Sequence, residues 1–346
     1  MRINACGDLH LLNEYFHNFI VGSDQVWRPE FIKNEKDVYM LGFASPNKNT
    51  IAYAASFGIS SLDLGIDEKR EYAARIRCFD HVSVREDSAV DLCAQLGVSA
   101  KCVMDPVFLL RKEEWDCLAD DYVGDINQEV VFYTIDEQME LSFQNFISSN
   151  FSSLKSRNIT WNMSIQEWLC RIRGCKLILT DSYHALCFAL IFNVPFIVIN
   201  PNMKTAERMR SLTRILQVEQ PIYNSIEEAT NGIRKNNDVD CDFGRINYNI
   251  EQQRHFSIEF ILNALAGGSI GEDIKRELLD RANKIQSDVI KKKIHDLCYS
   301  FWRYRVLRFI SFSTKKRQKY QKKFEEVKRM KKRLKADLFM GANNGI

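Results

Sequence analysis

The sequence lacks any apolar run close to the roughly 20 residues that a helix needs to cross a bilayer, which excludes an integral membrane protein. Its ten cysteines include no Cys-x-x-Cys pair, and the chain has no signal-peptide pattern. We therefore expect free thiols in a cytoplasmic protein, without a disulfide framework, a metal site or a bound cofactor. Motifs that read nucleic acid are also missing, so no nucleic-acid partner is expected.

The apolar residues that are present suffice for about two domains, since 45% of the 346 residues are hydrophobic. Short apolar runs that predict buried strands alternate with segments that predict helices. The expected strands are residues 19–21, 50–54, 81–84, 101–104, 130–135, 159–161, 176–179 and 196–199. The expected helices are residues 67–79, 86–96, 165–173, 182–192 and 207–216. This alternation predicts an α/β protein whose two domains face each other across a cleft.

The expected boundaries give three parts. Residues 1–112 form a first domain, and residues 113–266, which open with an acidic linker containing Gly124, form a second. Residues 267–346 lack strand signals and are expected to be a helical basic tail.

The tail concentrates positive charge. Residues 315–335 contain twelve Lys or Arg and two Glu, a local charge of +10, whereas the whole chain carries only +3. Just before it, residues 299–312 interleave aromatic and basic side chains, with Tyr299, Trp302, Val306, Phe309 and Ile310 on roughly one helical face. Residues 299–335 are thus suited to an anionic membrane surface, at the inner face of the membrane. A solvated helix or coiled coil is the alternative.

The most informative segment is 176–193, where a buried strand runs directly into a helix that is apolar nearly all round. Asp181 or Ser182 can cap this helix, and its N-terminus suits a phosphate or carboxylate. His184 lies in the first turn, where it can face such an anion and pass a proton to it. The alternative is a histidine that only completes the core.

Six sequence blocks occur in a familiar order between about residues 15 and 220. They are Phe19–Trp27, which contains Gly-Ser-Asp-Gln-Val-Trp; Val82–Ser88; Asp105–Val107 with Trp115; Ser164–Leu169; Thr180–Ala185 with Phe192–Ile197; and Arg208–Leu212. Together they resemble the polysaccharide pyruvyl transferase family, in the branch with an Asp-Ser-Phe/Tyr-His block.

The resemblance implies two Rossmann-like domains arranged as in GT-B glycosyltransferases. It also implies transfer of pyruvate from phosphoenolpyruvate, a co-substrate rather than a cofactor, as a ketal onto a sugar of a surface polysaccharide such as a capsule or exopolysaccharide, or its lipid-linked precursor. His184 is then the candidate general acid. Arg85, Ser182, Asp181 and Arg208 are candidate donor-binding residues, and Ser23, Asp24 and Gln25 are expected on the acceptor side of the cleft. Arg85 could instead be a surface residue at a helix start, paired with Glu86 or Asp87.

The chain departs from the family pattern at two places. Only eighteen residues precede Phe19, so the first domain is expected to lack most of the family's first βαβ unit. Ser182 stands where some members have an arginine, and Arg208, Lys204 or Arg171 would have to replace that charge. Two other functions therefore stay open: a nucleotide-sugar glycosyltransferase of similar fold, and an inactive truncated family member.

Overall fold

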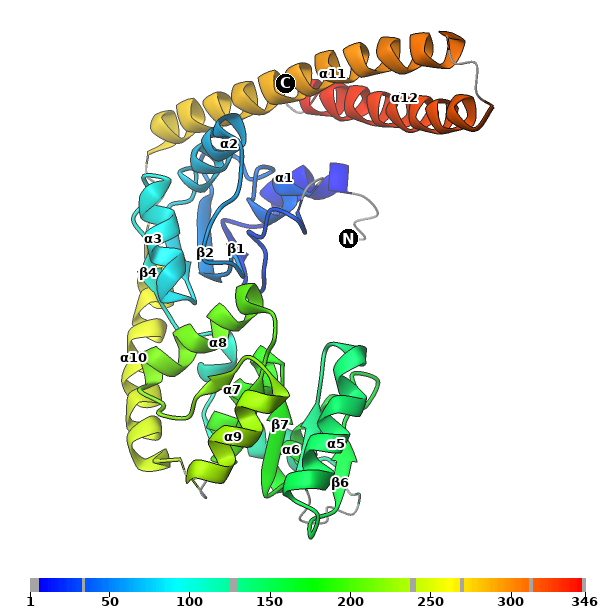
Figure 1. Cartoon of the computed structure of the whole chain (residues 1–346). Coiled ribbons are helices and arrows are strands. Elements are labelled where there is room, and N and C mark those ends of the chain that lie inside the picture. Colours follow the sequence, from blue (N-terminus) through cyan, green and yellow to red (C-terminus); the bar gives the residue numbers. More distant parts are fainter. Residues whose placement is uncertain are drawn as a thin grey trace. The chain divides into compact units, whose positions relative to one another are not determined.

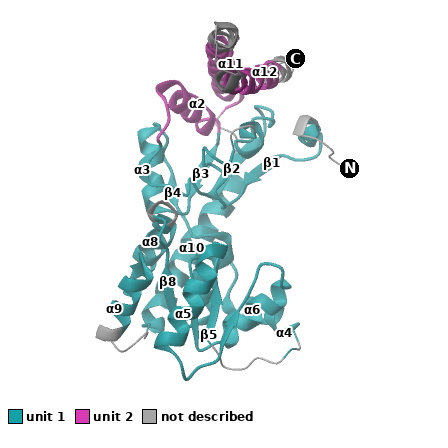
Figure 2. Cartoon of the chain, turned by 45° about the vertical axis from the view of Figure 1, so that its right-hand side comes forward, with its two compact units in different colours: residues 1–62, 79–269 teal, residues 63–78, 270–346 magenta. Residues whose placement is uncertain are grey.

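The computed structural model describes residues 6–32, 35–122, 124, 130–236, 241–267, 271–310 and 314–343. The chain forms two compact units (Figure 2). Unit 1 consists of residues 1–62 and 79–269 and holds both β-sheets, whereas unit 2 consists of residues 63–78 and 270–346 and its described elements are helical. The division into three parts at residues 112 and 266 stays a prediction.

Sheet A has four parallel strands in sequence order: β1 (Asn18–Val21), β2 (Asn49–Ala55), β3 (His81–Val84) and β4 (Lys101–Cys102) (Figure 1). Sheet B has five parallel strands in the order β6-β5-β7-β8-β9. They are β5 (Val130–Tyr133), β6 (Ser156–Asn158), β7 (Leu177–Thr180), β8 (Phe196–Ile199) and β9 (Ile222–Tyr223). All residues of β2, β7 and β8 are buried, as expected for parallel strands covered on both faces. The chain is therefore an α/β protein with parallel sheets.

Helices of unit 1 connect and cover these strands. They are α1 (Lys36–Tyr39), α3 (Asp87–Gln95), α4 (Lys112–Asp120), α5 (Glu140–Asn150), α6 (Ile165–Gly174), α7 (Tyr183–Phe192), α8 (Met203–Leu216), α9 (Ile226–Asn236) and α10 (Phe243–Ala266). Short 3-10 helices occur at η1 (Cys6–Glu14), η2 (Pro106–Phe108) and η3 (Glu137–Met139).

Helix α7 is apolar on all sides because other elements surround it. It packs against α6, α8 and α10 and against strands β7 and β8, and nine of its ten residues are buried. The helix ends at Asn193, which adopts the left-handed conformation with a φ of 59°, two residues before Pro195. Thus β7 and α7 form a rigid strand-to-helix junction.

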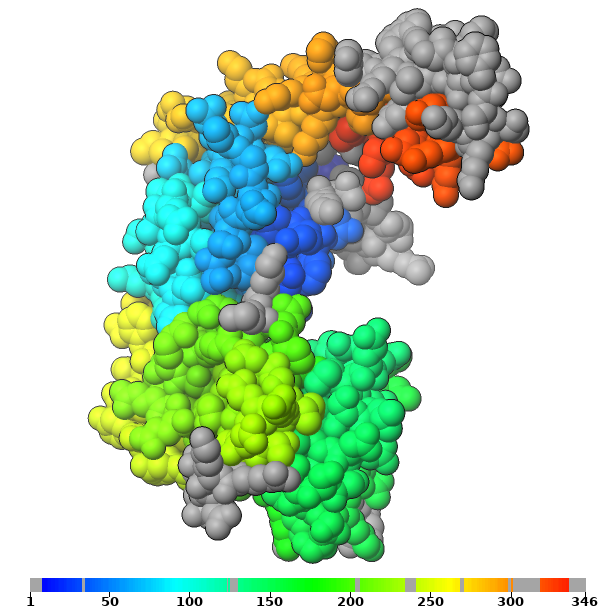
Figure 3. Space-filling model, viewed as in Figure 1, coloured from blue at the N-terminus to red at the C-terminus, as the bar shows by residue number. Residues whose placement is uncertain are grey.

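Helix α10 links the surroundings of the two sheets. Ser257 Oγ accepts a hydrogen bond of 2.9 Å from the backbone N–H of Met104, just after β4. The Nδ2 of Asn249 donates to the carbonyl of Leu216 at the end of α8, at 2.9 Å. In Figure 3 the yellow surface of α10 adjoins both the cyan residues near sheet A and the yellow-green residues near sheet B. The helix therefore holds both sheets within unit 1.

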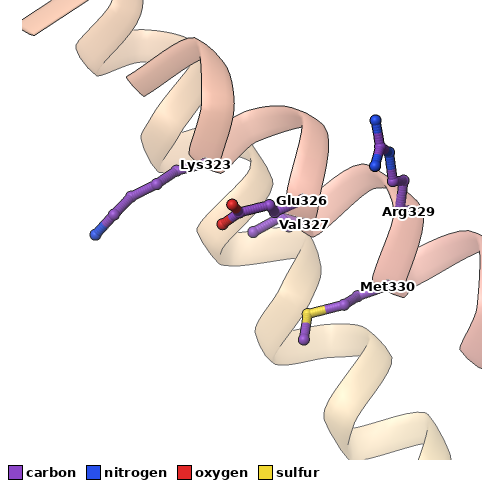
Figure 4. A pocket seen from close by; sticks show the side chains of 5 residues that line it. All are labelled: Lys323, Glu326, Val327, Arg329 and Met330. Atoms are coloured by element: carbon purple, nitrogen blue, oxygen red, sulfur yellow. The ribbon is translucent and has the colours of Figure 1, made fainter. Parts of the chain in front are cut away.

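Unit 2 contains α2 (Ile66–Ile76), α11 (Glu272–Ile310) and α12 (Thr314–Asn343). Helices α11 and α12 pack against each other as an antiparallel hairpin (Figure 1). Ala74 and Cys78 pack against Ala282 of α11, while Lys292 and Lys293 pair with Asp67 and Glu68 at 2.6 and 2.7 Å. A pocket of about 420 Å³ lies on the surface of α12, lined by Lys323, Glu326, Val327, Arg329 and Met330 (Figure 4).

The helical character of the tail is confirmed for the part that the structure describes. The expected aromatic face of residues 299–312 lies outside the residues whose side chains are described. Among the described residues, no helix has a stretch long and apolar enough to span a membrane.

Seven of the eight expected strands are present, with ends shifted by a few residues. The expected strand at residues 159–161 is wrong, because β6 lies just before it, at Ser156–Asn158, and carries polar side chains at the edge of sheet B. The expected acidic linker after residue 112 is also wrong in part, since it begins with α4. Strand β9 and helices α1, α4, α5, α9 and α10 were not predicted.

Candidate functional site

Turns that follow strands of both sheets meet at one place in unit 1. Ser23 follows β1, Arg85 follows β3 and Asp105 lies shortly after β4, all at the carboxyl edge of sheet A. The start of α7, directly after β7, brings Tyr183 and His184 from sheet B. In parallel α/β sheets this edge is where ligands bind. We use the term site cluster for Ser23, Asp24, Arg85, Glu86, Asp105, Tyr183, His184 and Arg208.

One carboxylate oxygen connects the two sheets. Oδ2 of Asp105 accepts hydrogen bonds from Ser23 Oγ at 2.9 Å and from Arg85 Nη1 at 2.6 Å. The same oxygen lies 3.9 Å from Nε2 of His184. Asp105 is only 1% exposed, and its other oxygen accepts a hydrogen bond from the backbone of Val107 at 3.2 Å. Asp105 is thus fixed by its own turn and holds side chains from both sheets.

Arg85 is completely buried, so the interpretation as a surface residue at a helix start is wrong. Besides Asp105, its guanidinium faces Glu86 at 3.5 Å and Asp24 at 3.6 Å. Burial disfavours its charge, but Tyr183, Glu86 and Asp105 raise its pKa above the ordinary value. Its Nη2 is buried and makes no hydrogen bond. The nearest carboxylate to this nitrogen is the exposed one of Asp24, at 3.6 Å.

Glu86 is the second buried acid of the site cluster. Its Oε1 accepts hydrogen bonds from Ser56 and Arg85, whereas its Oε2 is buried without a hydrogen-bond partner. Burial raises the pKa of Glu86, and the positive charge of Arg85 opposes this effect.

Arg208 reaches the site cluster from α8. Its Cζ lies 5.6 Å from the centroid of the Tyr183 ring, and the Cζ of Arg85 lies 4.4 Å from the same centroid. Arg208 is 8% exposed, its Nε makes no hydrogen bond, and no described carboxylate lies within ion-pair distance of it. Burial lowers the pKa of Arg208 and the positive charge of Arg85 lowers it further, whereas Glu86 and Asp24 oppose this shift from beyond ion-pair distance. A buried guanidinium without a direct ion pair is costly, which marks this position as a place for an anion.

His184 differs from every other residue of α7. It is the one residue of the helix that is not buried, and its side chain is 45% exposed. This exposure contradicts the alternative of a histidine that only completes the core. Partial burial lowers the pKa of His184, Asp105 opposes this shift, and Arg85 contributes to it. The imidazole is therefore neutral at pH 7 in the ligand-free protein.

The two residues before Tyr183 have different roles. Ser182 is the N-cap of α7, since its Oγ accepts the N–H of Ala185 at 3.4 Å. Asp181 does not cap the helix. Its carboxylate instead accepts hydrogen bonds from Thr134 Oγ1 at 2.7 Å and from the N–H of Ile135 at 2.8 Å, which fixes the turn after β5. The structure therefore does not bring the Asp181 carboxylate to the arginines.

The three residues expected on the acceptor side also separate. Ser23 is bound to Asp105, and Asp24 lies near Arg85 with 76% of its side chain exposed. Gln25 points elsewhere, because its Oε1 accepts a hydrogen bond from Arg28 at 2.6 Å and lies over Gly58. Gly58 has a φ of +64°, and a Cβ there would lie 2.1 Å from that oxygen. Gln25 thus stabilises a turn and does not join the site cluster.

Arg171, one of the two other cations considered as replacements for the missing arginine, is not found in the site cluster. Arg171 is bound to Glu167 at 2.7 Å and to Tyr122 at 3.1 Å. The side chain of Lys204 lies outside the described residues. Arg208 is the candidate replacement that lies near Arg85, since both guanidiniums contact the ring of Tyr183. Among the described residues, no group of three His, Cys, Asp or Glu is arranged to hold a metal ion.

A family model described as polysaccharide pyruvyl transferase matches residues 9–202, more than half of the chain. The chain belongs to this family. It is a transferase of polysaccharide biosynthesis, and the matched residues include every member of the site cluster except Arg208. No curated protein is significantly similar to the transferase in sequence.

Sequence reasoning did not identify Asp105, Tyr183 and Glu86 as members of the site of the transferase. A signal for Asp105 was present, because an Asp-Pro pair directly after a short strand places a carboxylate at the carboxyl edge of a sheet. Tyr183 lies between two residues that were identified, Ser182 and His184. Its contact with both arginines depends on the packing of α8, which the sequence pattern does not reveal.

Proposed function

We propose that the transferase moves the pyruvyl group of phosphoenolpyruvate onto two hydroxyls of one sugar, where it forms a cyclic ketal. The acceptor is a surface polysaccharide or its lipid-linked precursor. One observation carries this proposal: two buried guanidiniums, Arg85 and Arg208, each keep a nitrogen without a hydrogen bond close to the half-exposed His184.

The donor carries a phosphate and a carboxylate, and both are anions that arginine binds well. Arg208 has no carboxylate within ion-pair distance among the described residues, and Nη2 of Arg85 makes no hydrogen bond. Both cations are largely shielded from water, which strengthens their attraction for an anion. The N-terminus of α7, which Ser182 caps through the N–H of Ala185, adds to the positive potential.

Donor binding also prepares the acid. His184 has a lowered pKa in the ligand-free protein because of its burial. A nearby dianion favours the imidazolium, so the bound donor raises the pKa of His184 toward neutrality. His184 then carries a proton when the donor is in place.

In the reaction, His184 gives this proton to C3 of the enol, and a sugar hydroxyl attacks C2. The proton of that hydroxyl returns to His184. The C2–O bond to phosphate then breaks, the second hydroxyl attacks C2, and its proton leaves with the phosphate. The products are the ketal and hydrogen phosphate, and the imidazolium is restored.

Asp24 is suited to orient the acceptor. Its carboxylate is exposed and lies 3.6 Å from Nη2 of Arg85, so it can accept hydrogen bonds from sugar hydroxyls next to the donor. Sheets A and B would then form the two halves of a GT-B-like fold, with the donor mainly on sheet B and the acceptor mainly on sheet A.

We place the reaction at the inner membrane surface, where lipid-linked acceptors are assembled. Support comes from α12, on which exposed basic side chains outnumber acidic ones. The exposed basic residues are Lys319, Lys322, Lys323, Lys328, Arg329, Lys332, Arg333 and Lys335. Such a surface attracts anionic lipid by about 1 kcal/mol for each cation near the membrane.

Isothermal titration with phosphoenolpyruvate and with nucleotide sugars tests the donor. We expect phosphoenolpyruvate to bind, Arg208→Gln to weaken this binding strongly, and Arg210→Gln to leave it unchanged. Arg210 is a matched control because it lies on the same helix and bonds to Asn224, at 2.6 Å. Binding of a nucleotide sugar but not of phosphoenolpyruvate would show a glycosyltransferase instead, and binding of neither would indicate an inactive member.

A further inference from the structure

Two like charges come close together in the site cluster. The Cζ atoms of Arg85 and Arg208 both lie over the ring of Tyr183, at 4.4 and 5.6 Å from its centroid, so they are no more than about 10 Å apart. Buried cations at such a separation repel each other, and each lowers the stability of the other's charged form. Asp105, Glu86 and Asp24 offset part of this repulsion in the ligand-free protein, and a group in contact with both guanidiniums would offset more of it.

The Tyr183 ring is such a group. The face of an aromatic ring attracts cations within about 6 Å of its centroid, and both guanidinium carbons meet this distance. Tyr183 is 2% exposed and is the first residue of α7, next to the N-cap Ser182. The ring is therefore held rigidly by the same strand-to-helix junction that presents His184.

The hydroxyl of Tyr183 has a different part. It lies near Cys187, one turn further along α7, and its hydrogen-bonding effect lowers the pKa of that thiol against the larger opposing effect of burial. Burial raises the pKa of Tyr183 well above its usual range, so the phenol stays protonated at neutral pH and does not exchange a proton with the substrate. The aromatic face is thus the part of Tyr183 that the arginines use.

We propose that Tyr183 is a positioning residue whose ring holds Arg85 and Arg208 at a spacing that lets both bind one small molecule with two anionic groups. This inference rests on the proposed function for the identity of that molecule, a phosphate ester that also carries a carboxylate. The arrangement predicts that a ligand with both groups binds more tightly than inorganic phosphate, which can use only part of the pair.

Substitution of the ring tests the inference. Tyr183→Phe keeps the aromatic face and should retain affinity for phosphoenolpyruvate within about twofold. Tyr183→Leu removes both cation–π contacts, and we expect the KM for the donor and the Kd for inorganic phosphate to rise by about tenfold or more, with a smaller change in kcat. Normal donor affinity in Tyr183→Phe together with weak affinity in Tyr183→Leu would show that the ring matters and the hydroxyl does not.

Phe188→Leu is the matched control. Phe188 is another buried aromatic residue of α7, but it packs against Trp115 and Trp168, at centroid distances of 4.9 and 5.6 Å. It should lose thermal stability as Tyr183→Leu does, yet bind phosphate and phosphoenolpyruvate like the wild type. Equal loss of affinity in both variants, or none in Tyr183→Leu, would overturn the inference.

Should Tyr183→Leu fail to fold, fluorinated phenylalanines at position 183 replace it. Successive fluorines weaken the negative potential of the ring face with little change of shape, so donor affinity should fall stepwise with their number. Constant affinity across the series would also overturn the inference. If the wild type binds phosphate but not phosphoenolpyruvate, the proposed donor is wrong, and the phosphate measurements still decide the role of Tyr183.

Discussion

Replacement of Arg208 by Met should raise the free energy of unfolding and at the same time weaken binding of the donor phosphoenolpyruvate. A buried ion costs several kcal/mol even after the protein relaxes around it. No described carboxylate forms a direct ion pair with Arg208, so Glu86 and Asp24 offset this cost only in part. The ring of Tyr183 returns roughly 0.5 to 2 kcal/mol. Methionine has a similar length and no charge, so we expect the free energy of unfolding to rise by about 1 to 2 kcal/mol.

The loss of binding should be larger than the gain in stability. Removal of a buried ionic contact to a ligand costs about 2 to 5 kcal/mol, which corresponds to roughly a 30-fold to several-thousand-fold rise in Kd. Urea unfolding monitored by circular dichroism gives the first quantity, and calorimetric titration with phosphoenolpyruvate gives the second.

Arg171→Met is the control for the same chemical change. Arg171 is 6% exposed but is paired with Glu167 at 2.7 Å, so its replacement breaks a pair and should lower the free energy of unfolding by about 1 to 3 kcal/mol. Its donor affinity should stay unchanged. A destabilised Arg208→Met protein, or one that binds the donor normally, would refute the assignment of Arg208 as an unpaired anion-binding residue.

The other predictions concern the acid, its pH dependence, the second arginine and the tail. His184→Ala should abolish phosphate release. Because this side chain is half-exposed, the free energy of unfolding should fall by less than about 1 kcal/mol, whereas truncation of a buried core side chain costs roughly 2 to 5 kcal/mol. A loss in the larger range would show that His184 is part of the core. Because the pKa of His184 is lower in the folded than in the unfolded state, its contribution to stability should decrease as pH falls below about 6.5. NMR titration of the imidazole should show a midpoint below that value which added phosphate moves upward, and a midpoint that phosphate does not move would contradict this coupling. Arg85→Ala should lose donor binding and also about 3 to 5 kcal/mol of stability, as it leaves the buried Asp105 without its cation, whereas a stable variant would show that the pair matters little to the fold. Charge reversal of three exposed residues of α12 to Glu should weaken binding to anionic vesicles by about 100-fold at low salt, and reversal of three exposed lysines elsewhere should not. The α12 set is Lys322, Arg329 and Arg333, and the control set is Lys69, Lys101 and Lys155.

Much of the fold was predictable because the buried parallel strands are short, continuous apolar runs. Strand β6 was misplaced by a few residues because it lies at a sheet edge and carries Ser, Arg and Asn, which give no such signal. Helix α10 was missed although it has 24 residues, since its polar and apolar residues follow no clear stripe. Its contacts with both sheets come from residues far away in the sequence.

The candidate site also contains residues that could be predicted from the sequence and others that could not. His184 and Ser182 could be placed from the local strand-to-helix pattern alone. Gln25 points away from the site because it contacts Arg28 and the left-handed turn at Gly58. The sequence motif around Gln25 indicates neither contact. The central role of Asp105 depends on contacts with Ser23 and His184, each about 80 residues away, which one sequence without aligned relatives does not reveal.

The membership of α2 in unit 2 has a consequence for the order of folding. Its neighbours in the sequence, β2 and β3, pair within sheet A, but its own packing partner Ala282 lies some 200 residues further on. At a synthesis rate of about 5 to 20 residues per second, that partner emerges from the ribosome roughly 10 to 40 s after α2. During this interval the apolar face at Ala74 and Cys78 has no cover from α11. The nascent chain thus passes through a stage in which α2 exposes an apolar face, and chaperones should bind mainly to this helix until α11 has been synthesised.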